Sequence, residues 1–153
     1  MALDRLLDQA RTGPMYLGRA EIAQMVVDAL RYGQSILRHY ELHAFVVMPN
    51  HVHVLPTPQV AVPKLLASLK GITAKRANQI PGLTGRPFWQ EESYDHVARD
   101  GQEFERIRRY IEENPVGAGL ATIATEFQWS SAWRGQPARG PAAAQGGRPT
   151  QGV

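Results

Sequence analysis

Cysteine is absent from the 153-residue sequence, so the chain can form neither a disulfide bridge nor a thiolate metal site. Long apolar runs are absent too, which excludes a membrane-spanning helix. The first residues, from Met1 to Arg5, lack the basic and apolar segments of a secretory signal peptide. The length suits one domain, and no internal repeat is present. Because the sequence shows neither a signal peptide nor an apolar run that could span a membrane, we expect a soluble cytoplasmic protein with no membrane partner.

Acidic residues are missing from the middle of the sequence, where no Asp or Glu occurs between Glu41 and Glu91. A stretch that is locally positive favours a polyanionic partner such as nucleic acid. The alternative is that the cations only solvate the exposed face of a helix. The candidate nucleic-acid-binding residues in this stretch are Lys64, Lys70, Lys75, Arg76 and Arg86.

Two histidines, His51 and His53, lie two residues apart at the start of a predicted strand. Side chains at positions i and i+2 of a strand point to the same face of the sheet. The pair can therefore offer two imidazoles to one metal ion, while Val52 and Val54 face the core. A His-x-His pair on a strand also occurs without any catalytic role, so the pattern needs support from the rest of the chain.

The spacing of apolar residues predicts an α+β domain, an antiparallel sheet with helices mainly on one face. Pro49-Asn50 is a turn signal between two β-rich segments, which predicts a hairpin. Asp100 is a predicted helix cap, and Asn114-Pro115 is expected to end the helix that follows. The expected elements are a short helix over 2–10, a long helix over 19–39, strands over 42–48 and from 51 to 56 or 58, a helix from 63 to about 79, a strand over 94–98 and a helix over 101–114.

The end of the sequence, residues 134–153, is rich in Gly, Pro, Ala, Gln and Arg and has no apolar periodicity. We interpret it as a disordered basic tail. Residues 1–133 then form the predicted domain, and the segment Phe127–Trp129 is expected to dock on it.

Tyr110 and Asn114 share one face of the last predicted helix because they are four residues apart. If this helix packs beside the hairpin, a phenol and an amide meet the two imidazoles of His51 and His53. This combination favours one reaction, the metal-assisted attack of a tyrosine on a phosphodiester. A tyrosine has a pKa of roughly 10, so a divalent ion that stabilises the developing charge is needed at neutral pH.

Each of these residues also has an ordinary structural explanation. Tyr110 has isoleucines on either side and suits a core position, and Asn114 before a proline is a natural helix terminator. Tyr94 is a rival nucleophile, although it has no partner four residues on. Imidazole suits zinc, nickel or copper better than magnesium, so the residue types leave the metal open. The histidines without a partner at ligand spacing are His39, His43 and His96.

Four motifs, in this order, resemble those of a known family. They are Pro49-Asn50-His51-Val52-His53, Pro87-Phe88-Trp89-Gln90, Tyr94-Asp95-His96 and the run from Tyr110 to Leu120. The chain is similar in them to REP-associated tyrosine transposases, which are single-tyrosine HUH transposases of the insertion-sequence-200 type. The resemblance extends from about Leu3 to Trp133.

The resemblance implies a ferredoxin-like (RRM-like) α+β fold and the cutting and rejoining of single-stranded DNA beside a hairpin of a repetitive palindromic element. It implies that His51 and His53 bind Mg or Mn, that Tyr110 is the nucleophile and that Asn114 is the third metal ligand. The intermediate would be a 5′-phosphotyrosine, and the protein would be a monomer or a dimer.

Relatives usually begin with a β-strand and an arginine-containing loop that this sequence lacks. We therefore expect the sheet to lack the usual first strand and to expose an edge beside the hairpin. Two other functions remain open at this point. One is a non-catalytic module that binds hairpin DNA, and the other is an unrelated small metalloenzyme of the His-x-His type.

Overall fold

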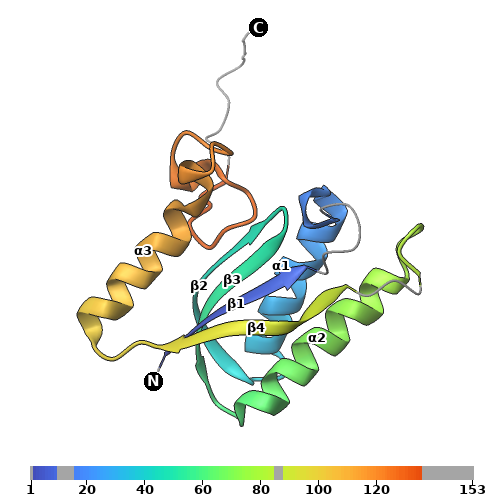
Figure 1. The fold of residues 1–153 in the computed structure, drawn as a ribbon, viewed down its shortest axis with the longest axis horizontal. Helices are drawn as coiled ribbons and strands as arrows, with labels where there is room; N and C mark the ends of the chain where they lie inside the picture. Colours follow the sequence, from blue (N-terminus) through green and yellow to red (C-terminus); the bar gives the residue numbers. More distant parts are fainter. Residues whose placement is uncertain (1, 10–15, 85–87, 136–153) are drawn as a thin grey trace, which may run out of the picture.

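The computed structural model describes residues 2–9, 16–84 and 88–135. In these residues a four-stranded antiparallel sheet has the strand order β2-β3-β1-β4. Helices cover both faces of the sheet (Figure 1). The order of the elements along the chain, β1-α1-β2-β3-α2-β4-α3, together with this strand order gives the predicted ferredoxin-like α+β fold.

The first element is the strand β1, Leu3–Gln9, which lies between β3 and β4 in the sheet. The expected short helix over 2–10 is therefore wrong, and so is the expectation that the first strand is missing. Leu3 and Leu7 are both buried, and a spacing of four residues fits one face of a strand as well as one face of a helix. The strands on either side offer hydrogen bonds to the backbone of this segment. A helix of this length is marginally stable by itself, because forming its first turn is unfavourable.

The predicted hairpin is present as β2, Tyr40–Met48, and β3, His51–Pro58. Val46 lies opposite His53 and Met48 lies opposite His51, which fixes the register of the histidine pair. The last strand is β4, Trp89–Val97, which begins earlier than the predicted range 94–98 and pairs with β1 at the sheet edge.

Two helices, α1 (Ala20–Ser35) and α2 (Val62–Asn78), cover one face of the sheet and bury the larger hydrophobic core. The helix α1 ends at Ser35, four residues before the predicted end. Tyr40 packs against its last turns, where the Tyr40 hydroxyl donates to the Leu30 carbonyl at 2.6 Å. A Cβ at Gly33 would collide with the Tyr40 ring, which explains a glycine inside this helix.

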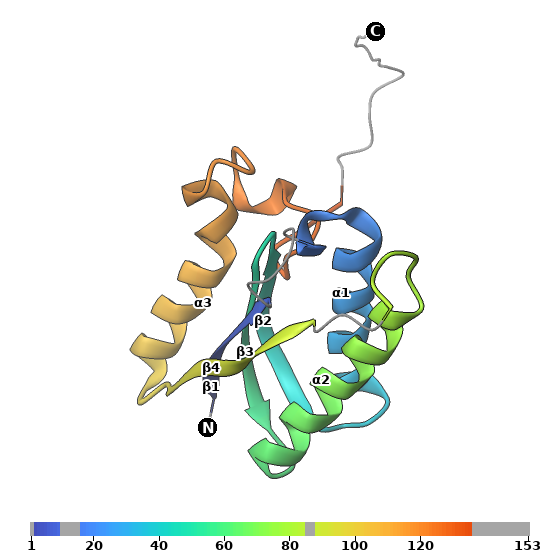
Figure 2. The same cartoon turned by 45° about the vertical axis from the view of Figure 1, so that its right-hand side comes forward.

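The third helix, α3 (Gly101–Gly117), lies alone on the opposite face of the sheet (Figure 2). The prediction that the helices lie mainly on one face therefore holds only for α1 and α2. Asp100 caps α3 as expected, because its carboxylate accepts from the Glu103 backbone N–H at 2.8 Å. The expected end at Asn114 is wrong, since the helix continues through Pro115. Pro115 lacks the N–H of one backbone hydrogen bond of the helix, and its side chain is buried.

Residues 129–131 lie along the outer edge of β2, where Val46 and Ser130 form an isolated β-bridge. The predicted docking of the segment around Trp129 is thus confirmed. The predicted boundary at residue 133 stays a prediction, because residues 136–153 lie outside the described ones. No helix among the described residues is long and apolar enough to cross a membrane.

Candidate active site

The two histidines of β3 point toward α3, on the face opposite the larger core. His53 is buried, with 7% of its surface exposed, while His51 at the end of the hairpin is half-buried. Val52 and Val54 point the other way into the larger core, as the alternation of a strand requires. The sheet therefore presents both imidazoles on one surface.

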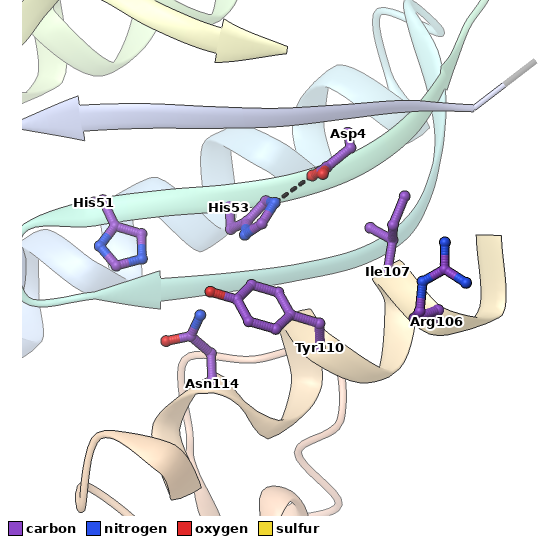
Figure 3. A pocket seen from close by; sticks show the side chains of 7 residues that line it. All are labelled: Asp4, His51, His53, Arg106, Ile107, Tyr110 and Asn114. Atoms are coloured by element: carbon purple, nitrogen blue, oxygen red, sulfur yellow. Dashed lines mark hydrogen bonds and ion pairs between the residues drawn. The ribbon is translucent and has the colours of Figure 1, made fainter. Parts of the chain in front are cut away.

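Tyr110 and Asn114 come from the facing side of α3. The rings of Tyr110 and His53 meet edge to face, with 5.8 Å between their centroids and 70° between their planes. Figure 3 shows the Tyr110 hydroxyl directed toward the space between His51 and Asn114. Tyr110 is 60% exposed, so it is not the core residue that its apolar neighbours suggested. The predicted convergence of a phenol, an amide and two imidazoles is present in the structure.

These side chains line one cavity of about 600 Å³ between the sheet and α3. Exposed side chains and an open mouth give access to it from solvent. The residues that line it are Asp4, His51, His53, Arg106, Ile107, Tyr110 and Asn114.

Asp4 is the member of this set that the sequence did not reveal. It is 8% exposed on the central strand β1, and its carboxylate contacts the Nε2 atom of His53. Because Nε2 contacts this carboxylate, Nδ1 is the ring nitrogen of His53 that is left for a metal ion. A segment interpreted as a short helix gave no reason to place a carboxylate here. Only the alternation of side chains along β1, once the strand is known, puts Asp4 on the histidine face.

The other polar contacts at the site fix the histidine pair and one wall of the cavity. His51 Nδ1 lies 2.9 Å from the Asn50 side-chain oxygen. Arg106 lines the cavity and pairs with Glu103 at 3.5 Å. Arg108 instead lies between two glutamates of its own helix, and the hydrogen bond with Glu105 raises the pKa of the guanidinium above its usual value. Arg106 is thus the arginine that lines the cavity.

The donor set of the cavity fits a divalent cation. Within the described part of the chain, no group of three His, Asp, Glu or Cys side chains is arranged as a complete metal site. The third ligand expected here is an amide, which belongs to none of those residue types. Two imidazoles, one amide oxygen and one carboxylate surround a space open to solvent. Oxygen atoms of a bound phosphate would supply the hard ligands that Mg or Mn prefers.

The basic residues of the acid-poor stretch are not part of this cavity. Lys64, Lys70, Lys75 and Arg76 belong to α2, which lies on the other face of the sheet. Lys75 and Arg76 line a separate groove of about 420 Å³ between α1 and α2, where the Arg76 guanidinium lies 5.7 Å from the centre of the Tyr32 ring. Arg86 lies outside the described residues.

Other residues considered from the sequence have structural partners. The His43 ring lies 2.7 Å from the Thr57 hydroxyl and meets the Phe104 ring edge to face. Phe88 is buried and meets the Trp89 ring edge to face, and the Trp89 indole N–H donates to the Thr73 hydroxyl at 2.7 Å. The side chains of the rival Tyr94 and of His96 lie outside the described ones.

A ferredoxin-like sheet that presents a histidine pair to a tyrosine on a separate helix defines the chain as a protein of the HUH type. The chain belongs to the family of IS200-like transposases, whose model matches residues 22–114 and so covers more than half of the sequence. The matched region contains both histidines, Tyr110 and Asn114.

Solved structures resemble the chain in fold. A REP-associated tyrosine transposase bound to a REP hairpin superposes with a TM-score of 0.62 at 16% identity, over 84% of this chain and 74% of that one. A candidate transposase from Deinococcus radiodurans R1 has a TM-score of 0.53 at 25% identity, over 74% of this chain and 89% of that one. No protein with a curated description matches the sequence.

Proposed function

We propose that this transposase is an endonuclease and strand-transferase of the REP-associated type. It cuts and rejoins single-stranded DNA that carries a hairpin, through a 5′-phosphotyrosine intermediate on Tyr110. The observation that carries the proposal is the shared cavity, in which the Tyr110 ring lies 5.8 Å from the His53 ring and its hydroxyl is directed toward His51 and Asn114.

The chemical step is an in-line displacement at phosphorus. The Tyr110 oxygen forms a bond to phosphorus as its proton leaves, and the bond from phosphorus to the 3′-oxygen breaks. The released 3′-oxygen takes up a proton and becomes a free 3′-hydroxyl. Because the phosphotyrosine retains the energy of the broken diester, another 3′-hydroxyl can reverse the displacement and rejoin the DNA.

The residues that would hold a divalent ion are His51, His53 and Asn114, with Mg or Mn as the proposed metal. When bound, the ion polarises the phosphoryl oxygens and stabilises the charge of the transition state. Asp4 keeps the His53 ring in one orientation, and Arg106 offers a positive charge at the wall of the cavity. The oligomeric state that we propose is a monomer or a dimer.

The proposed DNA contacts lie on a second surface. Lys64 and Lys75 are exposed on α2, and Lys70 and Arg76 are partly exposed beside them. Their charges suit the phosphates of a hairpin stem. The outer edge of β2 is covered by residues 129–131, so we propose that DNA reaches the catalytic cavity past the β4 edge. A chromosomal substrate would require a cytoplasmic location.

The decisive experiment incubates a labelled single-stranded hairpin with the protein and Mn²⁺, followed by a denaturing gel. We expect a covalent protein–DNA adduct for the wild type and none for Tyr110→Phe, because phenylalanine lacks the attacking oxygen. His51→Ala should reduce the adduct by at least about a hundredfold if metal stabilisation is lost.

The matched control is Tyr32→Phe, which removes a phenol from the other face of the sheet and should leave adduct formation unchanged. An adduct that persists in Tyr110→Phe would show that another residue is the nucleophile. Hairpin binding without any adduct would favour the non-catalytic binding module. Tight zinc binding with no need for Tyr110 would favour the unrelated metalloenzyme.

A further inference from the structure

We propose that Ser131 and Glu112 are positioning residues that hold the nucleophile helix in register with the histidine pair. The inference rests on the proposed function of Tyr110, and it names a part of the chain outside the catalytic cavity. Ser131 lies after the last helix, in the segment that covers β2, and Glu112 lies two residues after Tyr110 in α3.

Ser131 joins three parts of the molecule through one hydroxyl. Its oxygen accepts a hydrogen bond from the Phe45 backbone N–H of β2 at 3.0 Å. The same hydroxyl donates toward the Glu112 carboxylate of α3 at 3.1 Å, and the Phe45 carbonyl lies 3.3 Å away as a second acceptor. Its backbone N–H donates to the Phe45 carbonyl at 3.0 Å. The hydroxyl therefore links α3 to β2 at a single point.

This link reaches the catalytic cavity through the sheet register. Phe45 precedes Val46, which lies directly opposite His53 in the β2–β3 ladder. One end of the link is thus next to the strand position of a proposed metal ligand, and the other is on the helix that carries Tyr110. A shift of α3 along the sheet would break it.

Among the described side chains, the apolar contact between α3 and the sheet is small. A polar link therefore contributes more to fixing the position of this helix. Among the side chains that the structure describes, the core cluster on this face has five buried residues, of which Ile111 belongs to α3, and Phe104 and Ile107 of α3 are partly buried against it. The cluster beneath α1 and α2 has sixteen. A helix that buries little apolar surface depends more on specific polar contacts for its exact position.

Covering the edge of β2 does not require the side-chain link. The backbone N–H of Val47 donates to the Trp129 carbonyl at 2.8 Å, and the Ser131 N–H pairs with the Phe45 carbonyl. These two bonds hold the segment on the strand edge whatever the side chain of residue 131 is, and the Phe45 N–H is the one edge group that also uses the Ser131 hydroxyl. The bond between Ser131 and Glu112 is therefore additional, and its effect falls on α3. Arg108 holds the other oxygen of the Glu112 carboxylate at 2.7 Å and fixes its direction.

Four variants and one control test the link. Ser131→Ala and Glu112→Ala remove one partner each, whereas Ser131→Thr and Glu112→Gln keep a hydroxyl and an acceptor. Glu105→Ala is the matched control, because Glu105 also pairs with Arg108 on α3 but does not contact Ser131.

Two measurements are needed on the full chain. The first is amide hydrogen exchange of α3 and α1 without DNA. We expect the two alanine variants to exchange about tenfold faster in α3 and at the wild-type rate in α1. The second is the single-turnover rate of adduct formation at saturating hairpin DNA and Mn²⁺. It should fall at least tenfold, because displacement of a reacting group by about 1 Å can cost a hundredfold. The Kd for the hairpin should stay within twofold.

Ser131→Thr and Glu112→Gln should recover most of both signals, and Glu105→Ala should change neither. Unchanged α3 exchange in both alanine variants would overturn the inference, as would equal decreases of protection in α1 and α3, which indicate general destabilisation. If the wild type forms no adduct while α3 exchange rises as expected, the proposed function fails and the link between α3 and β2 stands.

Discussion

At the scale of single residues, the site depends on a carboxylate that contacts a histidine. Asp4 is buried beside His53, and its carboxylate oxygen contacts the Nε2 atom of that ring. A metal-binding histidine commonly donates its second ring nitrogen to a carboxylate, which fixes the tautomer and the ring orientation. Asp4 therefore occupies the position from which it can set how His53 meets a cation.

Replacing this carboxylate should weaken metal binding. We expect Asp4→Asn to raise the Kd for Mn²⁺ by about 10- to 100-fold, because loss of such a partner leaves the imidazole less basic and free to rotate. Titration calorimetry with Mn²⁺ alone measures this, with no need for DNA cleavage. The control is Asp28→Asn, since Asp28 is exposed on α1, where its carboxylate accepts from the Gln24 amide, far from the cavity. Equal affinities for the wild type and Asp4→Asn would exclude the role.

At the scale of the elements, close packing between a helix and the strand that follows it fixes α1 on the sheet. The Tyr40 ring of β2 occupies the space that a Cβ at position 33 would need. Burial raises the pKa of the Tyr40 hydroxyl far above its usual value. The protonated phenol can then donate to the Leu30 carbonyl at any physiological pH. The contact depends on the absence of a side chain at Gly33.

Gly33→Ala should therefore destabilise the protein although alanine is the better helix former. Displacing the Tyr40 ring should cost about 1–3 kcal/mol of unfolding free energy, as in other overpacked cores. Gly71→Ala in α2 is the matched control, because nothing lies within 4 Å of a Cβ at that position. There the gain in helix propensity should stabilise the protein by about 0.5–1 kcal/mol. Urea denaturation of both variants measures the difference, and equal shifts would contradict the packing argument.

At the scale of the whole molecule, the sheet separates the two surfaces to which we assign the proposed function. The candidate catalytic cavity lies under α3, and the basic residues of the acid-poor stretch lie on α2 across the sheet. In the proposed function, binding and cleavage are carried by different parts of the chain, so we expect that they can be altered independently.

Removing charge from α2 should weaken DNA binding without slowing the chemical step. We expect the double variant Lys64→Ala/Lys75→Ala to bind the hairpin more weakly. The salt dependence of log K should decrease by roughly 0.7–0.9 for each phosphate that the protein no longer neutralises. The single-turnover rate at saturating DNA should be that of the wild type. Arg19→Ala, which removes a cation already paired with Glu21, should change neither quantity. An unchanged salt slope in the double variant would place the DNA elsewhere.

The sequence by itself determined the parts of this protein that depend on short-range spacing. Alternation placed His51 and His53 on one face of a strand, a spacing of four placed Tyr110 with Asn114, and turn residues defined the β2–β3 hairpin. Each of these relations is fixed by the geometry of one element. They identified four of the residues that line the cavity, and the resemblance of four motifs indicated the family to which the chain belongs.

Only the tertiary structure decided the features that depend on a partner far along the chain. Residues 3–9 form a central strand because two other strands offer them hydrogen bonds, and this alone brings Asp4 to His53. The last helix continues through a buried Pro115, and it lies on the opposite face of the sheet from the other two, where Ile111 packs with residues of β2. Distant pairings of this kind stabilise a segment by burying it, and no pattern within the segment records which partner will do so.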